Sequence, residues 1–340
     1  MRAMVLHRPG PVENRPLWPE EVPVPEPKEN EVLVRIDTCG VCRTDLHVVE
    51  GDLPPVRPSV IPGHEIVGTV ARLGPGVRTL SVGDRVGVPW LHSTCGRCEY
   101  CLTGRENLCS EKTFTGYSEN GGYAPFVVGK ESYVLKLPAE GDAASWAPML
   151  CAGLIGYRAL KTAMPRFGGR IGFFGFGGSA HLTLQLAAKL GFDTVAYSRT
   201  AAHLALARSL GAAESVLTTE PRTPMEPTLD GAIVFAPAGS VVIDALREVR
   251  KGATVAIAGI HVSPIPSIDY DRLLFGERRI ASVEANTRAD AREFLDLAVR
   301  LHLQSTVEVR PLEDANEALA DLKSGRVDGA LVLDCRASAT

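Results

Sequence analysis

One segment near the middle of the chain restricts the possible folds more than any other. Residues 171–190 comprise a short apolar run, a glycine-rich turn and a stretch with apolar side chains at helical spacing. The pattern then repeats, with a strand predicted at 194–197 and a helix at 201–210. Strands that alternate with helices build a parallel, doubly wound sheet, so we predict an α/β Rossmann-type domain here.

The pattern of apolar residues differs between the amino-terminal part and the rest of the chain. In the amino-terminal part, short alternating runs at 31–36, 66–70 and 84–88 are broken by Gly and Pro and predict a β-rich domain. After residue 210 we expect strands at 231–235, 253–257 and 279–283, helices at 289–303 and 312–324, and a last strand at 329–333. That last strand could return to the first domain, which the sequence alone does not decide.

Composition and charge exclude several classes of partner. The 340 residues allow two domains of ordinary size, and 45% hydrophobic with 22% charged residues is typical of a globular protein. A net charge of −4 without a basic cluster argues against nucleic acid as a partner. Since no apolar run approaches the ~18 residues of a membrane helix and the first residues lack a signal-peptide core, we expect a cytoplasmic protein without a membrane partner.

The glycine-rich turn has the spacing of a dinucleotide-binding fingerprint. Gly175 permits the turn, Gly177 lets the backbone approach a pyrophosphate, and the small Ala180 lets the helix pack on the strand. The strand at 194–197 ends in Ser198 and Arg199, where an NAD site usually has a carboxylate for the ribose hydroxyl. Because an Arg can pair with a 2′-phosphate, NADP is favoured over NAD. The alternatives are that Arg199 is only a solvated surface residue and that the protein uses both cofactors. The candidate cofactor-binding residues of this domain are Gly175, Gly177, Gly178, Ser179, Ala180, Ser198, Arg199, Ala258 and Gly259.

Four cysteines lie on one short segment. Cys95, Cys98 and Cys101 are spaced by two residues, and Cys109 follows after seven more. Four thiolates fill a tetrahedral site with no open position, which predicts a structural zinc that fixes a loop. Four independent buried thiols are the alternative. Similar Cys₄ sites occur in nucleic-acid-binding modules, but this chain lacks the basic surface that such a module needs.

A second metal site is suggested by the remaining cysteines together with one histidine. The block from Cys39 to His47 contains two thiols, a cation, a hydroxyl, a carboxylate and an imidazole, and its CxxC pair could also be a redox dithiol or two core thiols. His64 and Glu65 add an imidazole and a carboxylate. Two Cys and one His with a fourth place for water or substrate is the pattern of a catalytic zinc, although a lone His is more often structural.

Taken together, these motifs resemble a known family, the zinc-dependent medium-chain alcohol dehydrogenases of the microbial type. The resemblance covers nearly the whole chain and rests on these segments, in the family's order: residues 40–47, 62–68, 82–86, 95–109, 121–124, 150–153 and the turn at 175–180. It implies a GroES-like catalytic domain formed by residues 1–153 and 290–340, and a dinucleotide-binding Rossmann domain formed by residues 154–289. Dimers or tetramers are common in the family, so a homo-oligomer is expected by analogy.

The resemblance also implies roles for individual residues. Cys42, His64 and Cys151 would hold the catalytic zinc, and Glu65 would lie beside the metal as an alternate ligand. Asp45 would orient the ligand His, and Arg43 would pair with the cofactor pyrophosphate. No role follows for Cys39 or Cys335.

The mechanism implied by the family is a reversible hydride transfer between an alcohol and NAD(P). A zinc-bound alkoxide would release hydride, while Thr44 would pass the hydroxyl proton through the cofactor ribose to His47, unless His47 is only a surface imidazole. Trp90, if it lines the pocket rather than serving only the core, and the methyl group of Thr44 would narrow the site, which favours small primary alcohols and their aldehydes. The rival functions are a zinc-free quinone reductase on the same fold and a metal-binding module without catalysis.

Overall fold

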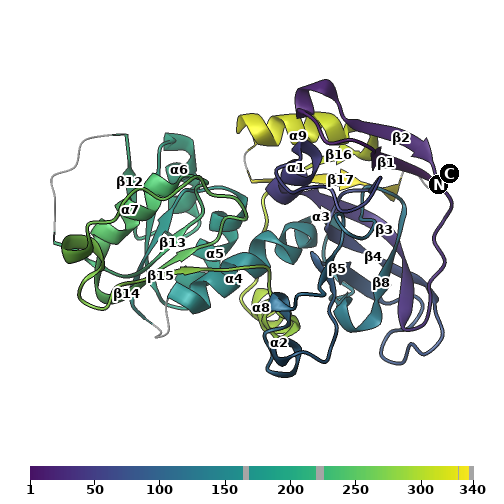
Figure 1. The fold of residues 1–340 in the computed structure, drawn as a ribbon, viewed down its shortest axis with the longest axis horizontal. Coiled ribbons are helices and arrows are strands. Elements are labelled where there is room, and N and C mark those ends of the chain that lie inside the picture. Colours follow the sequence, from purple (N-terminus) through teal and green to yellow (C-terminus); the bar gives the residue numbers. More distant parts are fainter. Residues whose placement is uncertain (164–167, 220–225, 328, 337–340) are drawn as a thin grey trace. The chain divides into compact units, whose positions relative to one another are not determined.

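The computed structural model describes residues 1–163, 168–219, 226–327 and 329–336 (Figure 1). The chain forms two compact units. The first unit contains Met1–Cys151, Ala285–Leu295 and Gln304–Thr340, and the second contains Ala152–Glu284 and Asp296–Leu303. In the described parts of both units, no helix combines the length and the apolar character that crossing a bilayer requires.

The second unit is built on a parallel, six-stranded sheet. Its strands follow the order β12-β11-β10-β13-β14-β15, and every neighbouring pair is parallel. The strands are β10 (Arg170–Phe174), β11 (Asp193–Ser198), β12 (Glu214–Leu217), β13 (Leu229–Val234), β14 (Val249–Ile257) and β15 (Arg279–Ser282). Because the strand order reverses between β10 and β13, the sheet is doubly wound, as the sequence predicted.

Helices α5 (Gly178–Lys189), α6 (Ala201–Ser209) and α7 (Gly239–Glu248) connect these strands, with a π-helical turn η5 (Tyr270–Leu274) before β15. Helix α4 (Ala152–Ala163) precedes β10, and α8 (Arg288–Arg300) follows β15, with its first part in the first unit and its last part in the second. The sequence did not predict α4 and α7. The central strands are buried along most of their length, and the rings of Phe174 and Tyr197 stack with centroids 4.2 Å apart on neighbouring strands. A parallel sheet needs such apolar strands because both of its faces are covered.

The first unit is β-rich. Its main sheet has the order β16-β17-β3-β4-β5-β9, and β8 also pairs with β3. The strands are β3 (Glu31–Val41), β4 (Glu65–Leu73), β5 (Arg85–Val88), β8 (Phe126–Lys130), β9 (Leu135–Lys136), β16 (Val307–Pro311) and β17 (Ala330–Asp334). Two smaller pairs join β1 (Arg2–Leu6) to β2 (Leu17–Glu21) and β6 (Leu91–Ser93) to β7 (Thr113–Phe114). Since β17 pairs antiparallel with β3, the last strand does return to the amino-terminal sheet (Figure 1).

Short helices complete the first unit. The α-helices are α1 (Arg43–Glu50), α2 (Glu99–Leu102), α3 (Ala143–Trp146) and α9 (Ala315–Ser324). The 3-10 turns are η1 (Val12–Asn14), η2 (Glu106–Leu108), η3 (Glu131–Tyr133), η4 (Ala147–Leu150) and η6 (Leu312–Asp314). The helix predicted at 312–324 is therefore a 3-10 turn followed by α9.

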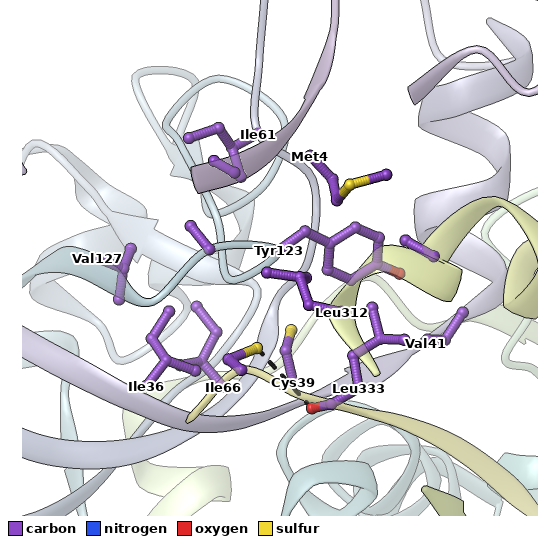
Figure 2. Close-up of a cluster of buried hydrophobic side chains, with 14 of the residues drawn as sticks. Met4, Ile36, Cys39, Val41, Ile61, Ile66, Tyr123, Val127, Leu312 and Leu333 are labelled. Carbon is purple, nitrogen blue, oxygen red and sulfur yellow. Dashed lines mark hydrogen bonds between the residues drawn. The ribbon is translucent and has the colours of Figure 1, made fainter. Parts of the chain in front are cut away.

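A cluster of apolar side chains forms the core of the first unit. Figure 2 shows Tyr123 in the middle of this cluster, with residues that come from β1, β3, β4, β8, η6 and β17. Tyr123 is fully buried, as are Cys39 and Cys335. Fully burying one large apolar side chain stabilises a fold by about 1.5–3 kcal/mol. Burial also raises the pKa of both thiols, so Cys39 and Cys335 are core residues in this structure.

Candidate active site and metal centres

The residues of the Cys39–His47 block are positioned by the start of helix α1. Cys42 is the residue that caps the helix, and the carboxylate of Asp45 accepts a hydrogen bond from the Cys42 backbone N–H at 2.9 Å. A carboxylate at the third helical position satisfies an amide that the helix leaves unpaired. The chain therefore turns from β3 into α1 at Cys42, with Thr44 and His47 buried one helical turn apart.

Asp45 holds His64 in place. Its carboxylate is completely buried and accepts from His64 Nδ1 at 2.8 Å, from the Gly63 N–H at 3.2 Å and from the Tyr123 hydroxyl at 3.3 Å. Because Nδ1 donates to Asp45, the other ring nitrogen, Nε2, carries the lone pair. This buried Nε2 has no hydrogen-bond partner among the described residues, as expected for an atom that binds a metal.

Four potential ligand atoms converge beside this histidine. One atom each from Cys42, His64, Glu65 and Cys151 lies within 4.8 Å of the others. The Sγ atoms of Cys42 and Cys151 are 3.7 Å apart. In a tetrahedral site with Zn–S bonds of about 2.3 Å, two sulfur ligands stand about 3.8 Å apart. The donor set therefore fits a zinc ion.

The electrostatics of the cluster also favour a cation. Burial and the nearby Cys42 raise the pKa of Glu65 well above its usual value. Hydrogen bonding from Cys151 lowers the pKa of Cys42. Although burial alone would lower the pKa of His64, Asp45 and Cys42 raise it. Since several acidic groups are crowded into a buried site, a bound divalent cation would relieve the cost of their charges.

Glu65 reaches this site because the facing strand has no side chain at one position. Gly40 on β3 pairs with Glu65 on β4. A Cβ atom at Gly40 would lie 2.0 Å from Glu65 Oε2, so any other residue would displace the carboxylate.

The second cluster lies on the excursion between β6 and β7. Sγ of Cys101 lies 3.9 Å from that of Cys95 and 3.5 Å from that of Cys98, and the Cys109 and Cys95 sulfurs are 3.6 Å apart. These distances are close to the sulfur spacing of a tetrahedral zinc site, about 3.8 Å. The sequence prediction of a closed Cys₄ set therefore agrees with the geometry.

Trp90 borders the cluster of Cys42, His64, Glu65 and Cys151, which we call the mixed cluster. Its ring packs edge-on against His64 at 4.9 Å and stacks on Phe114 at 4.7 Å and on Tyr117 at 6.1 Å. Trp90 is only 8% exposed. Trp90 is therefore both a core residue and a neighbour of the candidate ligand His64. The structure agrees with a core role and also with a place beside the candidate metal site.

Two polar partners in the first unit were missed by the sequence analysis. The Tyr123 hydroxyl donates to Asp45, and Asp52 lies 2.7 Å from His47 Nδ1 through its Oδ2 atom. Tyr123 lies in the segment 121–124, which carries part of the family resemblance but no assigned role, whereas no spacing rule connects Asp52 to His47. Arg43, the candidate pyrophosphate partner, is exposed, and its Nη2 atom donates to the Leu322 carbonyl at 3.4 Å.

The second unit contains the candidate cofactor turn. Gly175 has a φ of +89° and donates its N–H to the Tyr197 carbonyl at 3.0 Å, so the turn lies beside the end of β11. Gly177 caps α5, and a Cβ atom there would meet nothing within 4 Å, which leaves its backbone open to a ligand. Ala180 is fully buried, as a packing residue should be.

The remaining cofactor candidates lie at the same edge of the sheet. Ser198 ends β11, and Arg199 follows it with an exposed side chain. Ala258 and Gly259 follow β14 and are half-buried. Gly178 and Ser179 form the first turn of α5. The carboxyl ends of parallel strands meet at one edge, which is where open α/β sheets bind ligands.

Comparison with known proteins identifies the family. The model of the alcohol dehydrogenase GroES-like domain matches residues 28–139, and the model of the zinc-binding dehydrogenase family matches residues 178–300. A probable alcohol dehydrogenase of Mycobacterium tuberculosis is 47% identical over 98% of this chain and 97% of its own length.

Solved structures give the same answer. A cinnamyl alcohol dehydrogenase from Sorghum bicolor superposes with a TM-score of 0.89 at 27% identity, covering 98% of this chain and 97% of its own. An acetophenone reductase from Geotrichum candidum, in complex with NAD, superposes with a TM-score of 0.87 at 29% identity, covering 98% and 96%. With matches to both domains and to a relative over nearly its full length, the chain belongs to the zinc-dependent, medium-chain alcohol dehydrogenase family.

Proposed function

We propose that this protein oxidises small primary alcohols and reduces the corresponding aldehydes at a zinc site formed by Cys42, His64 and Cys151. The observation that carries the proposal is the convergence, in the first unit, of two thiols with the His64 Nε2 atom, which has no hydrogen-bond partner among the residues that the structure describes. A zinc ion bound there would polarise the substrate oxygen and favour loss of its hydroxyl proton. Glu65 would act as an alternate ligand, and Asp45 would keep the His64 ring in its ligating orientation.

Thr44 and His47 would handle the proton that the alcohol releases. They lie three residues apart on α1, so their side chains share one face of the helix. The Thr44 hydroxyl would accept the substrate proton while its own proton moves on toward the imidazole of His47, a side chain that commonly serves as a general base. In the direction of aldehyde reduction, the same two residues would return the proton.

The cofactor would be NADP rather than NAD. The turn from Gly175 to Ala180 would bind the pyrophosphate, with Arg43 as a further partner for it. Arg199, exposed at the end of β11, supports the choice of NADP because a guanidinium pairs with a phosphate and no carboxylate follows the strand. Titration of the wild type and Arg199→Ala with NADP and NAD tests this, since the variant should weaken NADP binding about tenfold or more and NAD binding little. An equal effect on the two cofactors would contradict the proposal.

The four-cysteine set would hold a second, structural zinc. Its four thiolates leave no place for a substrate, so its role would be to fix the loop between β6 and β7. Trp90 supports a narrow alcohol site because its large ring packs directly against His64. Residues 1–153 and 290–340 would form the catalytic domain, and residues 154–289 would form the cofactor domain.

A homo-oligomer, either a dimer or a tetramer, also belongs to this proposal. Strand β15 is at the edge of the second unit's sheet, and Ile260, Tyr270 and Phe275 nearby in the chain are exposed at 47%, 59% and 61%. An unpaired strand edge flanked by exposed apolar residues favours pairing with a second copy. The cytoplasm would suit a chain that needs several reduced thiolates.

Metal analysis combined with kinetics tests the proposed function. The purified protein should contain two zinc ions per chain. It should oxidise a series of primary alcohols with NADP, and the rate should fall as the carbon chain of the alcohol becomes longer or branched. Activity that persists after removal of all zinc would instead support a zinc-free reductase. Zinc binding without any NADPH binding would support a non-catalytic metal module.

A further inference from the structure

Asp52 comes immediately after helix α1 and returns to the last turn of that helix. Gly51 ends α1 in the left-handed conformation, with a φ of +86°. The N–H groups of Gly51 and Leu53 both donate to the His47 carbonyl, at 3.1 and 3.2 Å. The backbone on both sides of Asp52 is thus fixed to the same residue that its side chain contacts.

We propose that Asp52 is a positioning residue that sets the tautomer of His47 and passes the proton from His47 to solvent. This inference rests on the proton transfer from Thr44 to His47 proposed above. It is carried by the distance of 2.7 Å between Asp52 Oδ2 and His47 Nδ1. A carboxylate only accepts hydrogen bonds, so Nδ1 must be the protonated nitrogen and Nε2 the one that receives a proton.

The exposure of the two side chains indicates where the proton goes after it leaves His47. The side chain of His47 is 10% exposed, whereas that of Asp52 is 45% exposed. When Nε2 gains a proton, the imidazolium carries protons on both nitrogens, and the Nδ1 proton can move to Asp52 and then to water. The ring is then neutral again with its proton on Nε2, and tautomer exchange by way of solvent restores Nδ1–H for the next turnover.

A purely structural role for this contact is the competing explanation. Surface ion pairs typically stabilise a fold by only about 0–1 kcal/mol, and the loss of such a pair should leave catalysis unchanged. The chain offers a matched control, because His7 Nε2 and Glu20 Oε1 form another histidine–carboxylate pair in the first unit, at 2.5 Å, that has no part in the proposed proton transfer. Glu20→Gln should therefore behave as the structural explanation predicts.

The test compares the zinc-loaded wild type with Asp52→Asn, Asp52→Glu, His47→Gln and Glu20→Gln. The single-turnover rate of alcohol oxidation and the Kd for NADPH are measured for each, and the ring nitrogens of His47 are observed by ¹⁵N NMR. We expect Asp52→Asn to lower the rate about tenfold without changing the Kd, and to remove the preference for Nδ1–H. Asp52→Glu should recover part of the rate, and Glu20→Gln should match the wild type.

The other outcomes separate this proposal from the function on which it rests. If His47→Gln is slow but Asp52→Asn is as fast as the wild type, Asp52 has no positioning role although the relay stands. If neither variant is slow, the relay itself is wrong, and the positioning proposal falls with it. If the wild type does not oxidise alcohols at all, the ¹⁵N spectra still decide, since a His47 that carries its proton on Nε2 would overturn the proposed tautomer.

Discussion

The two metal clusters of the first unit are built in opposite ways. Cys95, Cys98, Cys101 and Cys109 lie within one short excursion and use a single ligand type. The mixed cluster takes Cys42 from the start of α1, His64 and Glu65 from the start of β4, and Cys151 from the end of η4. The first cluster needs only a loop, whereas the second needs the whole fold of the unit.

This difference agrees with the two proposed roles. Four thiolates complete a tetrahedron and leave nothing for a substrate, which suits a cluster that stabilises a loop. Three protein ligands, one of them a histidine that is held in orientation, leave one position of a tetrahedral metal site open, which suits catalysis. Removing one ligand from each cluster should therefore have different consequences, which gives the most direct test of the comparison.

The largest effect is expected from Cys42→Ala. This variant should contain one zinc ion per chain instead of two and should lose turnover by about 10³-fold or more, because the metal supplies most of the charge stabilisation. Its melting temperature and its affinity for NADPH should stay close to those of the wild type. Metal analysis, kinetics and a fluorescence titration with NADPH measure these quantities, and normal turnover would remove Cys42 from the ligand set.

Cys98→Ser should give the opposite result. It should also contain one zinc ion per chain, but it should keep much of its turnover at low temperature and should unfold more easily. Loss of a structural metal commonly costs several kcal/mol of folding free energy, which lowers the melting temperature by several degrees in a chain of this size. Calorimetry beside metal analysis checks this, and a variant as stable as the wild type would contradict a structural role.

The same contrast explains what could be predicted from the sequence. The Cys₄ set and the turn at Gly175 are local, so spacing alone indicated them. The mixed cluster depends on residues 109 positions apart, from Cys42 to Cys151, and no local rule joins these two. There the resemblance to a family named a ligand set whose side chains the structure brings together.

Elements were missed where the local signal was weak. Helix α1 was not predicted because its eight residues mix charged and apolar side chains, and its formation depends on the Asp45 cap and on packing. Strands β12 and β16 are short and partly exposed, so they lack an apolar run. Asp52 could not be found because its contact with His47 follows from the turn at Gly51, and the sequence carries no spacing signal for it.

Asp45→Asn should weaken zinc binding at the mixed cluster but not at the Cys₄ cluster, with a smaller loss of activity than Cys42→Ala. The amide can no longer accept every bond that the carboxylate accepts, and orientation of His64 should suffer. Changes at such supporting residues typically lower metal affinity or activity 10- to 100-fold. Zinc should be lost from the mixed cluster at lower chelator concentration than in the wild type, while the Cys₄ zinc should be retained. Equal loss from both clusters would indicate general unfolding instead.

The smallest effect is expected from Tyr123→Phe. This change removes one hydroxyl that donates to Asp45 at 3.3 Å and keeps the ring that fills the core. A hydrogen bond to a charged group contributes about 1.5–3 kcal/mol at ordinary length, and this long one should contribute at the lower end. Because three other donors still hold the carboxylate, we expect a fewfold lower zinc affinity at the mixed cluster with the Cys₄ cluster unchanged.

Competition with a zinc-binding dye measures both affinities, and Trp90→Phe serves as a control that alters packing beside His64 but leaves the bonds to Asp45 intact. If Tyr123→Phe weakens the Cys₄ cluster as much as the mixed one, the hydroxyl acts through the stability of the core rather than through the orientation of His64.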